Sequence, residues 1–189
     1  MSAALISRDP HLKRLADEGF EIEVRNSHLI VRSVPHVTAD GNLARGVLTC
    51  ALSLDGIGLT ATPQGDHTMY FAGGTPCHRN GAPMGNIINN SQKKRCGEMD
   101  VDHYLSSKPE VTNRYENIYD KVTAYERLIG GAARSLDRTA NARTHGKAMI
   151  ANDDSPFAIP DSASARYRIG GVNHKLKGRV AIIGLGGTG

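Results

Sequence analysis

The feature that most constrains this chain is a short aliphatic run that leads directly into closely spaced glycines. Residues 180–183 (Val-Ala-Ile-Ile) are all apolar, and Gly184-x-Gly186-x-x-Gly189 follows them without a gap. An all-apolar run of this length is typical of a parallel strand that is buried on both faces. In such a motif the first glycine permits a tight turn, the second lets backbone approach phosphates, and the third lets a helix pack closely. The run therefore predicts the first strand and phosphate loop of a nucleotide-binding unit.

Upstream of this motif the chain alternates between helical and extended patterns. Residues 8–18 predict a short helix, because Asp9 can cap it. Alternation of apolar and polar residues then predicts an antiparallel meander of about four strands, at residues 20–25, 28–32, 43–54 and 67–72. Asn26-Ser27 is expected to form the first turn, and Pro35 is expected to end the second strand.

The next part of the chain divides into a long connection and a helix. Residues 77–111 carry many glycine, asparagine and serine residues and few periodic apolar ones, so we expect a long, partly ordered loop. Between residues 113 and 136 apolar residues recur at three- and four-residue steps, which predicts an amphipathic helix that Gly130-Gly131 should kink or divide. Residues 137–160 are polar and indicate a linker or edge segment.

The predicted fold class follows from this order of elements. It is α+β, with an N-terminal helix, an antiparallel meander of about four strands, a long loop and an amphipathic helix. The start of a truncated Rossmann module comes after these elements. We therefore expect an N-terminal domain over residues 1–150, a linker and lead-in helix over 151–178, and the first strand and glycine loop over 179–189.

Composition excludes several classes of protein. The net charge is +4, but the basic residues are spread along the chain, aromatic residues make up 5% and Trp is absent. Nucleic-acid-binding surfaces instead gather Lys and Arg and add aromatic rings for stacking. No apolar run approaches the ~18 residues that would span a bilayer, and the N-terminus lacks the layout of a signal peptide. Three widely spaced cysteines suit a reducing compartment. We expect a cytoplasmic protein that binds neither nucleic acid nor membrane.

The glycine motif also carries a resemblance to a known family. Residues 182–189 (IIGLGGTG) resemble the opening strand and glycine loop of ThiF-like (ubiquitin-activating-type) adenylyltransferases, in which the double glycine is usual. Residues 165–180 resemble the family's lead-in, an arginine-containing segment and a helix that feeds the strand. More loosely, the first 150 residues resemble an uncharacterised domain that precedes ThiF-like modules in bacterial proteins. That likeness rests on residues 66–71, 106–109 and 123–125.

The resemblance implies a function for the parent protein. It would adenylate the C-terminal carboxylate of a ubiquitin-like or sulfur-carrier protein, use ATP and magnesium, and act as a homodimer. It also implies a set of nucleotide-binding residues, namely Arg166, Gly184, Gly186, Gly187 and Gly189. The 189-residue chain ends within this motif, so we expect no nucleotide bound to it and no turnover by it. Its catalytic residues stay unknown, and its own role would be partner binding or dimerisation.

Two alternatives stay open at this stage. The order helix, meander, loop, helix is also that of ubiquitin-conjugating domains, and Cys77 follows the meander as a conjugating cysteine does. A thiolate there could accept the activated carboxylate as a thioester, although a cysteine and the adjacent His78 rarely form a catalytic pair. The second alternative is the front part of an NAD-dependent oxidoreductase. No metal site is expected, because the acidic, histidine and cysteine residues lack ligand spacing.

Overall fold

The computed structural model describes residues 2–54, 61–63, 67–109 and 112–145. The predictions made for residues 151–189, among them Arg166 and the glycine motif, lie outside these residues. The helices are α1 (Ser2–Arg8), α2 (Pro10–Asp17) and α3 (Ile118–Leu136). The strands are β1 (Ile22–Arg25), β2 (His28–Val37), β3 (Leu43–Leu54), β4 (Ala61–Pro63), β5 (Thr68–Ala72), β6 (Ile88–Asn90), β7 (Lys94–Cys96), β8 (Met99–Val101) and β9 (His103–Ser106).

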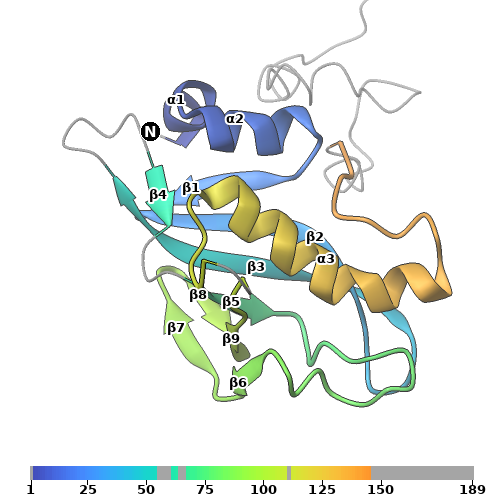
Figure 1. Cartoon of the computed structure of the whole chain (residues 1–189). Coiled ribbons are helices and arrows are strands. Elements are labelled where there is room, and N and C mark those ends of the chain that lie inside the picture. Colours follow the sequence, from blue (N-terminus) through green and yellow to red (C-terminus); the bar gives the residue numbers. More distant parts are fainter. Residues whose placement is uncertain (1, 55–60, 64–66, 110–111, 146–189) are drawn as a thin grey trace, which may run out of the picture.

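Most of the strands form one antiparallel sheet with helices packed on one face (Figure 1). Its strand order is β1-β2-β3-β5-β9-β6, and β4 pairs with β3 beyond the point where β5 pairs. The core lies between this sheet and the helices, where buried apolar side chains of α2 and α3 meet those of the strands. Residues from α2 and α3 in this core are Leu12, Leu15, Ile118, Val122, Tyr125 and Ile129, and from the strands Leu29, Val31, Leu48, Cys50, Met69, Phe71 and Leu105.

A separate hairpin, β7–β8, covers part of the opposite face of the sheet. Tyr70 alternates with the core residues Met69 and Phe71, so its ring lies on the face away from the helices. Lys94 of β7 is placed over this ring, 5.6 Å from its centroid. The tip of the hairpin reaches the β1–β2 turn, where Asn26 donates a hydrogen bond to Glu98.

Many of the predicted elements are confirmed, and with them the α+β class. The side chain of Asp9 accepts hydrogen bonds from the N–H groups of His11 and Leu12, and so caps α2. The β1–β2 hairpin turns at Asn26 and Ser27, which both have positive φ, as a tight two-residue turn requires. Strand β3 and helix α3 also lie where the alternation and the helical periodicity predict them.

The prediction that Pro35 ends the second strand is wrong. Strand β2 continues to Val37, and Pro35 is paired with Arg45 of β3. The register shifts between Val31 and Val34, and β1 pairs only as far as Val31. Past that point the other side of β2 has no neighbouring strand in the described sheet until Val37, so a proline without an N–H is tolerated there.

The prediction of a long loop over residues 77–111 is also wrong. Four short strands, β6 to β9, occupy residues 88–106, and β9 lies inside the sheet between β5 and β6. Each of these strands has only three or four residues. Elements so short do not complete the alternation by which a strand is recognised in a sequence.

Helix α3 is not divided at Gly130-Gly131, so this part of the expectation is wrong. It runs unbroken for 19 residues from its N-cap, Asn117, whose side chain accepts a hydrogen bond from the N–H of Asp120. Its buried face packs on β2 and the rest of the core, and this packing outweighs the low helix propensity of two glycines.

The segment after α3 turns back onto the domain as an edge segment. Ala140 and Ala142 are buried, and Arg143 forms a bridge with Phe20 just before β1. Among the described residues no helix is both long and apolar enough to cross a membrane.

Candidate functional site

An open groove of about 520 Å³ lies between the loop at residues 77–87 and the C-terminal half of α3. Figure 1 shows this loop leaving β5 on the side of α3 that is remote from α1 and α2. The residues that line the groove are His78, Arg79, Asn80, Met84, Asn86, Ile87, Leu128, Gly131 and Ala132. The groove therefore combines an apolar floor with a polar, basic rim, which is the general character of a binding site.

The loop that forms one wall of the groove is held by backbone hydrogen bonds. The N–H of Cys77 donates to the carbonyl of Val37 (2.9 Å), and the N–H of Met84 donates to the carbonyl of Pro76 (3.0 Å). The N–H of His78 donates to the carbonyl of Ala82 (2.8 Å), which closes a small turn within the loop. The wall is thus fixed on the β2 edge although it contains no regular strand.

The helix wall presents apolar surface that the core does not use. Leu128 is 38% exposed and Leu136 is 41% exposed, and both belong to the second half of α3. Leu43, 43% exposed, is the cross-strand partner of Val37, whose side chain packs near Ala133 of the same helix. These three are the large hydrophobic residues exposed in the described part of the chain, so its exposed apolar surface gathers at this end of the domain.

Cys77, the candidate thioester cysteine at the start of this loop, is buried and does not line the groove. Its side chain is 0% exposed, and its Sγ donates a hydrogen bond to the carbonyl of Thr75 (3.3 Å). Burial raises the pKa of the Cys77 thiol. His78 lines the groove instead. The other two cysteines are buried as well, and burial raises the pKa of Cys50 to about 11.

The glycine pair that follows β5 makes a strand-exit turn whose amides are already engaged. Gly73 and Gly74 both have positive φ, and their N–H groups donate to Oδ2 of Asp102 at 2.9 and 3.3 Å. These hydrogen bonds, the one from Gly73 first, lower the pKa of Asp102 although burial opposes them. The turn thus binds a carboxylate of the chain itself and is not a phosphate loop.

Two buried histidines lie beside this turn. His103 contacts Oγ of Ser91 through Nδ1 at 3.0 Å. His36 is 0% exposed and stacks edge-on against Phe71, and neither of its ring nitrogens makes a hydrogen bond of good geometry within the described structure. Burial lowers the pKa of both histidines. In the described residues no group of three or more histidine, cysteine or acidic side chains is placed to hold a metal ion.

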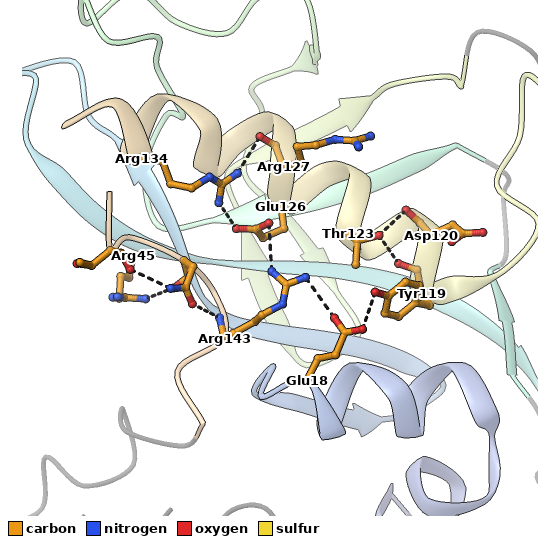
Figure 2. A network of polar contacts seen from close by, with 11 residues as sticks. Glu18, Arg45, Tyr119, Asp120, Thr123, Glu126, Arg127, Arg134 and Arg143 are labelled. Atoms are coloured by element: carbon orange, nitrogen blue, oxygen red, sulfur yellow. Dashed lines mark hydrogen bonds and ion pairs between the residues drawn. The ribbon is translucent and has the colours of Figure 1, made fainter. Parts of the chain in front are cut away.

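A network of charged residues joins α2, α3 and the segment after α3 (Figure 2). Arg143 donates to Glu18 at 3.2 Å and lies 3.9 Å from Glu126, which also accepts a hydrogen bond from Arg134 at 2.5 Å. Tyr119 donates to Glu18 at 2.7 Å. Although burial opposes them, these hydrogen bonds hold the pKa of Glu18 below its usual value. The network fixes the chain that leads toward residue 146, and we assign it a structural role.

The groove is the candidate site that the sequence did not indicate. Its walls come from residues about fifty positions apart in the chain, and no motif marks either of them. One signal was present: Leu128 is a large apolar residue that falls outside the apolar stripe of its helix. The predicted nucleotide residues, Arg166 and the glycines from Gly184 to Gly189, lie outside the described residues.

Comparison with known proteins identifies a family but no function. Neither a curated protein nor a solved structure matches the chain. A family model does match, over residues 10–162, and its description is "Domain of unknown function (DUF6791)". The match covers α2, the whole sheet and α3. Because it spans most of the sequence, the chain belongs to the DUF6791 family.

Proposed function

We propose that this chain is the N-terminal part of a ThiF-like adenylyltransferase and that its α+β domain binds the protein partner. The observation that carries the binding role is the groove beside α3, whose lining combines the exposed Leu128 with the basic side chains Arg79 and His78. The parent protein would adenylate the C-terminus of a ubiquitin-like or sulfur-carrier protein in the cytoplasm, as a homodimer. The glycine motif at residues 184–189 supports the nucleotide part of this proposal.

Within the proposed enzyme, the nucleotide should bind where backbone amides are free to contact phosphate. ATP with magnesium would supply the adenylyl group that activates the partner's carboxylate, so the protein's task is positioning and charge stabilisation. The amides of the glycine pair that follows β5, Gly73-Gly74, already bind Asp102. We therefore assign the nucleotide to Gly184, Gly186, Gly187 and Gly189, with Arg166 as a further phosphate ligand.

A conjugating-type transferase is the less favoured proposal, because its nucleophile would have to be Cys77. A transfer cysteine must be reachable by a large activated partner and must form a thiolate. Cys77 is fully buried, and burial raises its pKa. Both properties oppose attack on an adenylate.

The nucleotide part of the proposal is tested by ATP binding to the natural full-length gene product in the presence of magnesium. Gly186→Ala places a methyl group where backbone must approach phosphate, and should weaken ATP binding by at least about tenfold, the equivalent of ~1.4 kcal/mol. Gly85→Ala is the matched control, because a Cβ at Gly85 meets nothing within 4 Å. Equal ATP affinity for both variants would reject the assignment, and tighter binding of NAD than of ATP would favour the oxidoreductase.

A further inference from the structure

We propose that the groove beside α3 binds an extended segment of the protein partner that carries an acidic side chain next to an aliphatic one. The carboxylate would pair with Arg79, and the aliphatic side chain would pack against Leu128. This inference rests on the proposed partner-binding function and names the chemistry of the partner. The carboxylate that pairs with Arg79 would belong to an acidic side chain of the partner, because the partner's C-terminal carboxylate would instead react with ATP.

The apolar half of the argument comes from the helix wall. Leu128 is 38% exposed although it is a leucine in the middle of a well-packed helix. One turn further, a Cβ at Gly131 would meet nothing within 4 Å, so the space above the helix is open at that point. Ala132 and the buried Met84 and Ile87 complete an apolar floor. A floor of small and aliphatic residues suits an extended peptide with aliphatic side chains.

The charge of the rim selects an acidic partner. Arg79 and His78 line the groove, and none of the lining residues is acidic. Arg79 is exposed and makes no ion pair with any residue that the structure describes. Asn80 lines the groove and uses its side-chain oxygen to accept from the N–H of Ala82 (3.1 Å), so the group that it offers for further hydrogen bonds is its amide NH₂, a donor. The rim therefore offers donors and positive charge but no carboxylate of its own.

The same charge argues against a second copy of this chain as the occupant. Two grooves brought together about a twofold axis would set Arg79 of each copy near a basic rim, with no lining carboxylate between them. Like charges desolvated in this way oppose association. A partner with a carboxylate can pair with Arg79, whereas a second copy of the groove offers no carboxylate to it.

The proposal is tested by nuclear magnetic resonance with the ¹⁵N-labelled 189-residue chain and two short peptides. They are acetyl-Gly-Leu-Glu-Leu-Gly-amide and the same peptide with glutamine in place of glutamate. We expect both to shift amide signals of residues 78–87 and 128–132, and the glutamate peptide to bind about threefold more tightly, as one exposed ion pair allows. Arg79→Gln should abolish this preference. Arg95→Gln, which removes an exposed arginine that pairs with Asp100 on the far hairpin, should preserve it.

Several outcomes would overturn the proposal. Shifts outside the groove, or equal affinity for the two peptides, would remove the acidic segment as occupant. A chain that sediments as a dimer and becomes monomeric on Leu128→Asp would assign the groove to a second copy. These results are independent of ATP: a loss of nucleotide binding would reject adenylation, and the peptide titration would still decide the occupant of the groove.

Discussion

The two adjacent glycines of α3 give a prediction that tests the packing of the domain in detail. A Cβ at Gly131 would meet nothing within 4 Å, whereas a Cβ at Gly130 would lie 2.9 Å from Nη1 of Arg134 and 3.0 Å from Oε1 of Glu126. Those two atoms form the hydrogen bond at the centre of the charged network. Glycine to alanine at these two neighbouring positions should therefore change the free energy of unfolding in opposite directions.

The magnitudes follow from helix propensity and from the cost of disturbing the ion pair. Gly131→Ala should stabilise the chain by about 1 kcal/mol, the usual gain for a glycine in a helix interior. Gly130→Ala gains the same amount but displaces a hydrogen bond between charged groups, worth roughly 1.5–3 kcal/mol. Because Glu126 is 4% exposed and cannot turn to solvent, we expect a net loss of about 1 kcal/mol.

Urea unfolding followed by circular dichroism measures this difference. A gap of ~2 kcal/mol between the two variants separates their midpoints by about 1 M when the slope is near 2 kcal/mol/M. Arg134→Ala supplies the control, because in that background Gly130→Ala should lose most of its cost. If Gly130→Ala stabilises the wild-type chain as much as Gly131→Ala does, the reasoning from the network is refuted.

Three further predictions concern buried polar groups. Burial lowers the pKa of His36 in the folded chain, so the unfolded chain binds more protons than the folded one. The free energy of unfolding should therefore be highest above pH ~6.5 and should fall as pH drops toward the lower pKa of the folded state. His36→Leu should flatten this part of the stability–pH curve, and an unchanged slope would contradict the assignment. The native chain should react slowly with a thiol reagent because all three cysteines are buried, and rapid labelling of Cys77 without denaturant would show that the loop opens. Asp9→Ala should lower the free energy of unfolding by about 1 kcal/mol through loss of the α2 cap, whereas Asp17→Ala, in an exposed ion pair, should change it little.

The elements that the sequence predicts well are those whose signal is local. The cap at Asp9, the turn at Asn26-Ser27 and the stripe of α3 each lie within one element, so the residues alone identify them. The prediction at Pro35 was wrong because a proline can continue a strand where no neighbouring strand needs its N–H. Whether that holds depends on where β1 ends, which is a property of the sheet and not of β2.

The rest depends on tertiary context that no local pattern carries. Strand β9 has only four residues, and it is held in the sheet by pairing with β5 on one side and β6 on the other. The unbroken course of α3 through Gly130 depends on packing against strands far away in the sequence. The groove needs both the 77–87 loop and α3 in position before its apolar floor and basic rim meet.

The most direct test of the proposed role is whether the domain binds the partner or accepts it covalently. The experiment combines the natural full-length protein with ATP, magnesium and a ubiquitin-like or sulfur-carrier partner. Wild type and Cys77→Ala are compared by pyrophosphate release and on non-reducing gels. Circular dichroism confirms that both are folded. We predict equal pyrophosphate release and no thiol-sensitive adduct, because the Cys77 thiol is buried and hydrogen-bonded to Thr75. An adduct that reductant cleaves and that disappears with Cys77→Ala would contradict the binding role and establish a transferase.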